Sequence, residues 1–370
     1  MAKKKILVID NGPFIMKNGR FYSMQSTGSL VEDLTSQGFS VELLQFYQKA
    51  KSDEVINGFN ISDLGIKIHA FKCYTSWIKY LVYIWVYFKT IFLCMKLDFI
   101  YLFFPSSFRF ISFILYFFNK QFGLNIRGEK HLTDKSSIWM FKHAKLIFTV
   151  SPHFSEFVSS YNTNVFDKRP TILFSEMDSV SRNYLKKDNF KLMYLGRLDI
   201  DKGILDLVNA ISLLNSKSSI SLELNIVGNG DALLQVQSLI NKLRISNIHL
   251  CGGVFEKEEL KRCYLTSDLY VLPTYHEGFP RTLYECMVFG TPILTTFVGG
   301  IPYLMSDGFN CFEIISHSPS NIAERIEYVL KHYSNMYRIC QNAKNTFINK
   351  MQSLPNTHGK QLGLELKKIL

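Results

Sequence analysis

Two carboxylates, Glu277 and Glu285, flank a segment that combines a turn residue with a helix-start residue. Gly278 follows the first carboxylate directly, and Pro280 comes five positions before the second. Proline is favoured at the first position of a helix, where its missing N–H costs nothing, so we expect a helix to begin within residues 279–281. Glu277 would then lie on the loop before this helix, and Glu285 more than one turn inside it.

The backbone N–H groups of that first helical turn form a positive pole that can hold a phosphate. An acid, an anion site and a second acid in one short span suit a ligand with hydroxyls at both ends and phosphates in the middle. A nucleotide sugar has this layout, so residues 273–285 are a candidate nucleotide-sugar site.

A second segment supplies cations. Arg197 and Lys202 follow Gly196 in the run Tyr-Leu-Gly-Arg-Leu-Asp-Ile-Asp-Lys-Gly, directly after a predicted strand. A diphosphate carries about two negative charges, which these two cations and the helix pole could neutralise.

Glycine loops follow two further predicted strands. Gly228 and Gly230 lie in one of them, and Val-Gly-Gly-Ile-Pro at residues 298–302 forms the other. Glycine lets the backbone approach a ligand closely. Neither loop completes the G-x-G-x-x-G pattern and no Walker A sequence occurs, so NAD- and ATP-binding folds receive no support.

The elements that must position these residues alternate strand and helix patterns in two segments. In the first segment we expect strands at 6–9, 41–44, 99–103 and 146–150 and a helix at 28–37. In the second we expect strands at 191–195, 222–227, 247–251, 269–272 and 292–296, with helices at 204–214, 232–243, 257–265 and 281–289. Short connections between strand and helix indicate parallel strands with right-handed crossovers, hence two doubly wound α/β domains.

The length of 370 residues suits two domains better than one core. We expect an N-terminal domain over residues 1–175 and a C-terminal domain over 190–340. A linker rich in Lys, Asp, Ser and Asn would lie near 170–190, and a helical tail would occupy 341–370.

Lys and Arg number 42 against 31 Asp and Glu, and the net charge of +11 favours anionic partners, although solubility alone is an alternative explanation. The seven cysteines are odd in number and form no C-x-x-C pair, which favours a reducing compartment and argues against a zinc site or a disulfide framework. The apolar run at residues 6–9 is too short for a signal peptide, so we expect a cytoplasmic protein.

Aromatic residues crowd residues 74–122, but lysines and arginines interrupt the stretch repeatedly, so that no window offers the roughly 18 uncharged residues of a membrane-spanning helix. Trp and Tyr mixed with Lys are typical of helices that lie in a membrane interface. We therefore expect peripheral contact with an anionic membrane, with a buried aromatic core as the alternative.

Taken together, the G-R-L-x-x-x-K-G segment, the V-G-x-G-D loop, the two carboxylates around E-G-F-P and the V-G-G-I-P loop resemble the retaining family 4 glycosyltransferases (glycosyl transferases group 1). The resemblance covers about residues 190–335 and is only architectural over 1–170. It implies a GT-B fold, in which two Rossmann-like domains face an interdomain cleft. The C-terminal domain would hold the nucleotide sugar and the N-terminal domain the acceptor, with no obligatory metal or other cofactor.

By this resemblance Arg197 and Lys202 would bind the diphosphate and stabilise the departing nucleotide. Glu277 would contact sugar hydroxyls, and Glu285 would hold the ribose hydroxyls. The remaining implied donor-binding positions are Gly196, Gly228, Gly230, Phe279, Arg281, Thr282, Leu283 and, on the first N-terminal loop, Gly19.

Two histidines are weaker candidates for the site, and two positions depart from the pattern of the family. His131 could contact the donor sugar, although an ordinary loop histidine is an alternative, and His276 would line the pocket. The family often has an acid where Tyr303 stands and glycine where Pro280 stands, and the proline removes one backbone donor.

The sequence thus predicts a cytoplasmic, membrane-associated hexosyltransferase that uses a nucleotide diphosphate sugar and acts with retention in surface polysaccharide or lipopolysaccharide assembly. Its acceptor would be a lipid-linked glycan, and nucleic acid would not be a partner. The alternatives are a nucleotide-sugar epimerase or a phosphorylase on the same scaffold, and a non-catalytic glycan or membrane adaptor.

Overall fold

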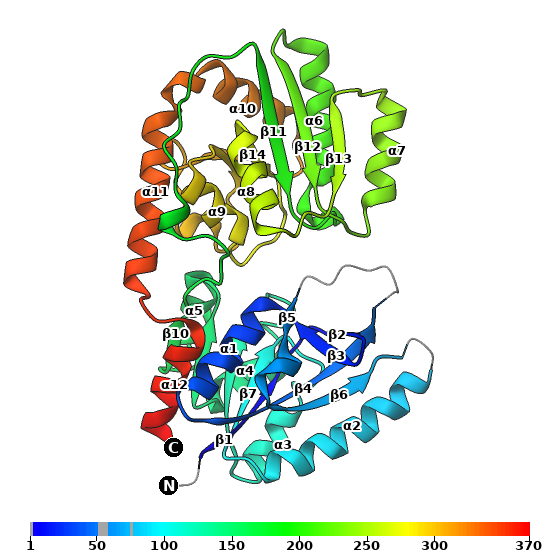
Figure 1. Cartoon of the computed structure of the whole chain (residues 1–370), viewed down its shortest axis with the longest axis vertical. Coiled ribbons are helices and arrows are strands. Elements are labelled where there is room, and N and C mark those ends of the chain that lie inside the picture. The colour runs from blue at the N-terminus through cyan, green and yellow to red at the C-terminus, as the bar shows by residue number, and fades with distance from the viewer. Residues whose placement is uncertain (1–2, 51–57, 75–76) are drawn as a thin grey trace. The chain divides into compact units, whose positions relative to one another are not determined.

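The computed structural model describes residues 3–50, 58–74 and 77–370. The chain divides into two compact units, of which the first comprises Met1–Thr171 with Leu354–Leu370 and the second Ile172–Ser353 (Figure 1). Each unit is an α/β layer structure with its own largely parallel sheet, which confirms the prediction of two Rossmann-like domains.

The first unit has a parallel sheet in the order β6-β4-β1-β7-β8-β9-β10, so β1 lies between β4 and β7. An antiparallel hairpin and one short strand extend it beyond β4. The strands are β1 (Lys5–Ile9), β2 (Phe14–Lys17), β3 (Arg20–Ser23), β4 (Ser40–Lys49), β5 (Phe59–Asn60), β6 (Lys67–Lys72), β7 (Phe99–Phe104), β8 (Gln121–Ile126), β9 (Leu146–Thr149) and β10 (Val165–Asp167).

Helices cover both faces of this sheet. Strand β1 shows the division, because Leu7 and Ile9 join one buried cluster while Ile6 and Val8 join the other. The first cluster is closed by α2 (Ile78–Met95), α3 (Ile111–Phe117), α4 (Lys135–His143) and α5 (Pro152–Ser159), and the second by α1 (Gln25–Ser36) and α12 (His358–Ile369).

The second unit has a sheet in the order β13-β12-β11-β14-β15-β16, all parallel. Its strands are β11 (Asn189–Leu195), β12 (Ser221–Val227), β13 (Ile248–Gly252), β14 (Leu269–Leu272), β15 (Ile293–Thr296) and β16 (Phe312–Ile314). Its helices are α6 (Ile204–Lys217), α7 (Leu233–Leu243), α8 (Lys257–Thr266), α9 (Arg281–Phe289), α10 (Pro319–Lys331) and α11 (Met336–Ser353). Every strand and helix expected here is present within three residues of its predicted ends. Strand β16 and helix α10 were not anticipated, and α11 begins five residues before the helical tail expected at 341–370.

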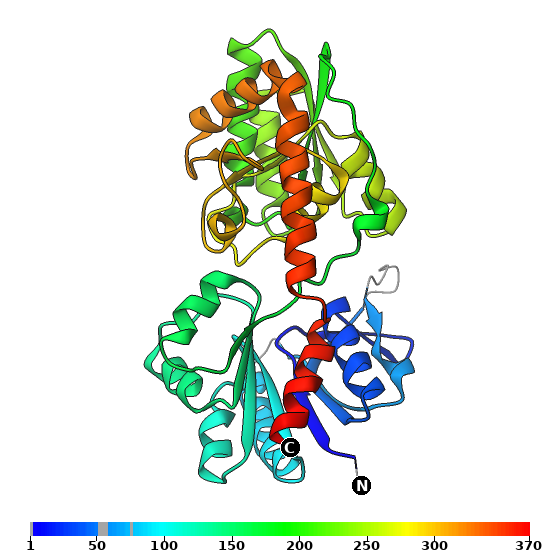
Figure 2. The ribbon, with the colours of Figure 1, turned by 90° about the vertical axis from the view of Figure 1, so that its left-hand side faces the viewer.

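The expected tail at 341–370 divides between the units (Figure 2). Cys340, Ala343 and Phe347 of α11 pack into the core of the second unit, while α12 lies on α1 of the first. The contact between α12 and α1 is close at Gly359, where a Cβ would come 2.4 Å from the Cβ of Asp33. Gly363, one turn further along α12, lies equally close to Gln37, which follows α1. These two glycines therefore let α12 lie directly against α1.

The segment expected as a linker near 170–190 packs instead against the second unit. Phe174 and Tyr184 are buried in its core. Arg182 donates through Nη1 to the Tyr264 carbonyl at 3.0 Å and to the Thr291 hydroxyl at 3.1 Å. These buried contacts explain why the unit begins at Ile172 although the local composition is polar.

The aromatic stretch at 74–122 includes α2, β7 and α3, and its Thr75 and Ser76 lie outside the described residues. Within the part of the chain that the structure describes, α2 is the one helix long and apolar enough, by length and composition, to cross a membrane, and only 17% of it is buried. Strand β7 is fully buried. The stretch is therefore partly core and partly exposed helix.

Candidate active site

The second sheet changes winding direction between β11 and β14. Strands β12 and β13 follow β11 on one side, and β14, β15 and β16 continue on the other. In open parallel sheets the loops that leave the carboxyl ends of the strands part at such a switch point and form a crevice in which ligands bind. The cationic loop after β11 and the acidic loop after β14 are therefore neighbours at this edge.

Hydrogen bonds tie these two loops together. Lys202, at the end of the 3-10 turn Ile200–Lys202, donates through Nζ to Glu277 Oε1 at 2.6 Å and to the His276 carbonyl at 3.2 Å. Its side chain is 13% exposed and that of Glu277 is 19% exposed. The Tyr275 N–H donates to the Asp201 carbonyl at 2.8 Å. The structure thus joins two predicted catalytic residues that lie 75 positions apart.

The loop after β15 supports the acidic loop from its other side. The Gly300 N–H donates to the Glu277 carbonyl at 3.2 Å. The Thr274 hydroxyl donates to the His276 carbonyl at 3.1 Å, and the Thr296 hydroxyl donates to the Thr274 carbonyl at 2.6 Å. Glu277 is therefore positioned by three loops rather than by its own segment alone.

The glycines of these loops are required by backbone packing. A Cβ on Gly228, whose φ is +147°, would lie 1.8 Å from the Gly196 carbonyl oxygen. A Cβ on Gly230 would lie 2.4 Å from the Leu198 carbonyl oxygen, and one on Gly203 1.9 Å from that of Pro273. At Gly228 and Gly230 the neighbouring loop occupies the position that a Cβ would take, so loop packing requires both glycines, and the close approach of a ligand there stays a prediction.

Arg197 differs from Lys202 in its setting. Its side chain is 73% exposed, and Nη1 lies 2.9 Å from Asp199 Oδ2. The Tyr194 hydroxyl donates to the Arg197 carbonyl at 2.6 Å, so the backbone is fixed while the guanidinium extends into solvent. Arg197 therefore presents an accessible charge at the same sheet edge.

Helix α9 begins at Arg281 with Pro280 as its N-cap, as the sequence predicts. The Leu283 N–H already donates to the Pro280 carbonyl at 3.2 Å, which engages one of the expected phosphate donors. The Tyr270 hydroxyl donates to Thr282 Oγ1 at 2.7 Å, and the Phe279 ring packs 4.5 Å from the Tyr284 ring between centroids. These contacts fix the first turn of the helix.

Glu285 lies one turn inside α9 and is 6% exposed. Burial raises the pKa of its carboxyl, while a hydrogen bond from the Tyr264 hydroxyl and the charge of Arg281 act in the opposite direction. The Tyr264 hydroxyl donates to Oε2 at 2.5 Å. Glu285 is thus a buried hydrogen-bond acceptor with a fixed orientation, and the helix that carries it begins shortly after Glu277.

Two predicted residues belong to the first unit. Gly19 forms the turn of the β2–β3 hairpin together with Asn18, both with positive φ, and a Cβ there would meet nothing within 4 Å. His131 lies before α4, with Nδ1 3.0 Å from Asp134 Oδ2. The Asn-Gly pair is a strong hairpin signal in the sequence, although we expected only a loop at these residues.

A polar cluster at the switch point of the first sheet was not anticipated. Asp10, which directly follows β1, is 1% exposed and accepts from the Thr27 hydroxyl at 2.7 Å. Arg127, which directly follows β8, lies 3.8 Å from Asp10 and donates to the Ser26 hydroxyl at 3.1 Å. Polar residues placed directly after buried strands were the signal that would have found it.

Within residues 3–50, 58–74 and 77–370, no group of three or more His, Cys, Asp or Glu side chains is arranged to hold a metal ion. At the switch point of the second sheet, the loop after β11 supplies the cations Arg197 and Lys202, and α9 begins with a third cation, Arg281. The site therefore combines an accessible guanidinium, an ammonium paired with a carboxylate, a helix N-terminus and a buried carboxylate. This set can bind a phosphorylated ligand and accept hydrogen bonds from its hydroxyls.

Comparisons with known proteins agree with this chemistry. Residues 178–346 match the family of glycosyl transferases group 1. An uncharacterized glycosyltransferase of Methanocaldococcus jannaschii is 27% identical over 160 residues, which are 43% of this chain and 40% of that protein. The capsular polysaccharide biosynthesis glycosyltransferase CapM of Staphylococcus aureus is 27% identical over 175 residues, which are 46% of this chain and 44% of CapM. The match thus spans less than half the length of these curated relatives.

Among solved structures, HepE of Anabaena in complex with UDP and glucose is similar over 99% of this chain and 100% of HepE, with a TM-score of 0.69. The two sequences are 15% identical, so the likeness concerns the fold. The chain therefore has the GT-B fold, and its residues 178–346 match the family of glycosyl transferases group 1.

Proposed function

We propose that this protein transfers a hexose from a nucleotide diphosphate sugar to a glycan acceptor, with retention at the anomeric carbon. The observation that carries the proposal is the Lys202–Glu277 pair at 2.6 Å, which joins the loops after β11 and β14 at the switch point of the second sheet. The match of residues 178–346 to glycosyl transferases group 1 and the structural likeness to HepE, a protein solved with UDP and glucose, support a nucleotide-sugar donor.

The roles follow from the charge that the reaction develops. The bond between the anomeric carbon and the β-phosphate oxygen breaks, and a bond to an acceptor oxygen forms on the same face of the sugar. Negative charge grows on the leaving diphosphate, where Lys202, Arg197 and the first turn of α9 would stabilise it. The leaving phosphate would take the acceptor's proton, so no strong general base is needed.

The two carboxylates would hold the ends of the donor. Glu277 would accept hydrogen bonds from sugar hydroxyls, and its ion pair with Lys202 would place both groups at the reacting bond. Glu285 would accept from the ribose hydroxyls, because its buried carboxylate is already oriented by Tyr264. Losing one preorganised donor to the leaving group should reduce the rate by about a hundredfold or more.

For the acceptor we propose a lipid-linked glycan used in surface polysaccharide assembly on the cytoplasmic side of the membrane. The similarity to CapM, whose name places it in capsular polysaccharide biosynthesis, supports this pathway class. The net charge of +11 suits an acceptor that carries phosphate.

The test is a panel of nucleotide sugars incubated with the purified chain and detergent-dispersed lipid-linked glycans, with release of nucleotide as the readout. We expect release with one donor, a fall of about a hundredfold or more in Lys202→Met and Glu277→Gln, and little change in Lys217→Met, an exposed lysine at the end of α6. Proton NMR of the product would report the anomeric configuration.

Two results would contradict the proposal. Product with inverted configuration would refute retention, and transfer that is unaffected in Lys202→Met and Glu277→Gln would refute the site. Nucleotide binding with no transfer to any acceptor would favour a non-catalytic role.

A further inference from the structure

Helix α2 packs on the first sheet along one narrow stripe. Val86, Thr90 and Cys94 are buried and recur every four residues, so they form one line along the helix. Val86 and Cys94 belong to the buried cluster that α3, α4 and α5 also close. Most of the remaining helix surface is exposed.

That exposed surface is apolar and rich in aromatic rings. Between Trp77 and Phe92, eight large apolar side chains are each more than 40% exposed: Trp77, Ile78, Tyr80, Leu81, Ile84, Trp85, Phe88 and Phe92. The end of α3 adds Tyr116, Phe117 and Phe118, of which Phe117 is 81% exposed. We refer to these eleven residues as the α2–α3 surface. Soluble proteins rarely expose contiguous apolar patches of such extent unless the patch contacts another apolar phase.

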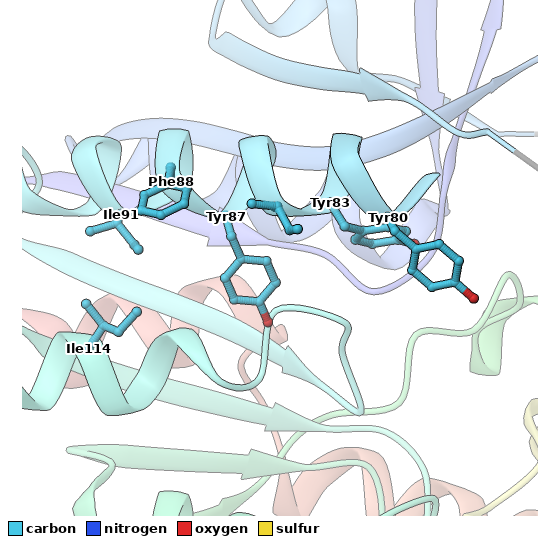
Figure 3. A pocket seen from close by; sticks show the side chains of 7 residues that line it. Tyr80, Tyr83, Tyr87, Phe88, Ile91 and Ile114 are labelled. Atoms are coloured by element: carbon cyan, nitrogen blue, oxygen red, sulfur yellow. The ribbon is translucent and has the colours of Figure 1, made fainter. Parts of the chain in front are cut away.

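A groove runs between the two helices that bear this surface (Figure 3). Its volume is about 490 Å³, and its walls are entirely aromatic or aliphatic: Tyr80, Tyr83, Ile84, Tyr87, Phe88, Ile91 and Ile114. This volume is about three times that of an apolar cavity of roughly 150 Å³ that holds one benzene molecule. The groove therefore offers room for hydrocarbon next to the exposed rings.

The segment of chain that bears this surface carries mostly positive charge. From Cys73 to Gly128 the chain has six cations and a single acid, Asp98. Two of the cations extend over the rings of the surface, because Lys89 Nζ lies 4.9 Å from the Trp85 ring and Lys79 Nζ 5.1 Å from the Tyr80 ring. Aromatic rings at the boundary of a bilayer, with lysines that reach its headgroups, have this arrangement.

A basic groove beside α3 extends the same charge pattern. Tyr116 lines it together with Lys142, His143 and Lys145, and its 11 lining residues include no acid. The Tyr116 ring contacts the His143 ring with 4.5 Å between centroids. Cationic groups thus border the apolar surface where lipid phosphates would lie.

We propose that the α2–α3 surface inserts into the boundary between the headgroups and the hydrocarbon of an anionic lipid bilayer, with α2 lying in the plane of the membrane. The inference goes beyond the proposed sugar transfer and does not depend on it. A second copy of the chain is disfavoured as the occupant, because it would bring another set of cations against the first. A spanning orientation of α2 is disfavoured, because it would strip Val86, Thr90 and Cys94 from the core.

The test is flotation of the full chain with vesicles of phosphatidylcholine alone or mixed with phosphatidylglycerol. We expect binding to the mixed vesicles and weaker binding to phosphatidylcholine alone. Lys79→Gln with Lys89→Gln should weaken binding to mixed vesicles about 25-fold, at about fivefold per lysine. Phe88→Ser with Phe92→Ser should weaken it roughly a hundredfold, at about tenfold per buried ring.

The control is Leu234→Ser, which removes an 82% exposed apolar side chain from α7 in the second unit and should leave vesicle binding unchanged. Brominated lipids should quench the emission of Trp77 and Trp85 in the wild type. Circular dichroism and urea unfolding, measured separately, should be the same in all variants and report that they are folded. Loss of sugar transfer with intact vesicle binding would count against the proposed function alone.

Three results would overturn the inference. The wild type could remain unbound to mixed vesicles, or the Phe88→Ser, Phe92→Ser variant could bind them as the wild type does. The wild type could also be a dimer in the absence of vesicles that this variant makes monomeric, in which case a second copy covers the surface.

Discussion

The Lys202–Glu277 pair allows a quantitative test, because its geometry places it between two energetic regimes. Exposed ion pairs contribute about 0.2–1 kcal/mol, whereas removing one partner of a buried pair costs about 3–5 kcal/mol. The two side chains here are 13% and 19% exposed, and Nζ and Oε1 are 2.6 Å apart. We therefore expect Lys202→Met to lower the free energy of unfolding of the second unit by about 2 kcal/mol.

A double-mutant cycle separates the pair from its surroundings. Lys202→Met, Glu277→Gln and the double variant would be unfolded in urea, and we expect a coupling free energy of about 1.5 kcal/mol. The matched control is the Lys331–Glu327 pair of α10, with Nζ and Oε1 2.9 Å apart and side chains 58% and 31% exposed. Its coupling should be only about 0.3–0.5 kcal/mol.

The same variants connect stability to activity. If the two groups act together on the donor, the double variant should lose about as much activity as either single variant, because residues that act as a unit are not additive. Stability changes that add within about 0.5 kcal/mol would refute the coupling. Activity losses that multiply in the double variant would refute the shared role.

Three further predictions follow from particular contacts. If the proposed function holds, Glu285→Gln should weaken binding of the donor nucleotide about tenfold in calorimetry, because charge-assisted hydrogen bonds to the ribose are lost. Tyr264→Phe keeps the carboxylate and should weaken binding less, and equal effects of the two variants would contradict the ribose role. Gly228→Ala should lower the free energy of unfolding by about 3 kcal/mol, because its Cβ would overlap the neighbouring loop. Gly19→Ala should lower it by only about 1 kcal/mol, because a Cβ there would meet nothing within 4 Å. Urea unfolding would measure both changes, and equal costs would contradict the packing argument. Burial lowers the pKa of His358, whose Nε2 lies 2.8 Å from the Tyr101 hydroxyl. At low pH the unfolded chain therefore binds a proton that the native chain does not. The free energy of unfolding of the first unit should fall by up to about 1.4 kcal/mol per pH unit as the pH drops below about 6.5. His358→Gln should flatten this slope in urea titrations at several pH values, and an unchanged slope would contradict the assignment.

Local signals in the sequence were sufficient for much of the second unit. Pro280 after Gly278 located the start of α9, because proline favours the first turn of a helix whatever surrounds it. The buried strands were found because each is a short apolar run bounded by polar turns. The turn at Asn18 and Gly19 has an equally local signal, because an Asn-Gly pair adopts the positive φ angles that a tight hairpin turn requires.

Other features have no local signal, because they depend on contacts between distant segments. Residues 341–370 were correctly predicted as helical in character, yet their division between two cores depends on Phe347 fitting one unit and Gly359 fitting α1 of the other. The exposure of α2 likewise depends on how few of its residues reach the first sheet. Periodicity reports which positions are apolar, but packing decides which of them are covered.

The candidate site shows both contributions. The sequence by itself determined which residue types are available to the candidate site, since Arg197, Lys202, Glu277 and Glu285 were singled out by residue type and by neighbouring glycine and proline. The tertiary structure decided that Lys202 and Glu277 meet, because the strand order places β11 beside β14 and so brings together loops that lie 75 residues apart. Strand order is set by the packing of whole helices and strands, and a single segment of sequence carries no record of its neighbour in the sheet.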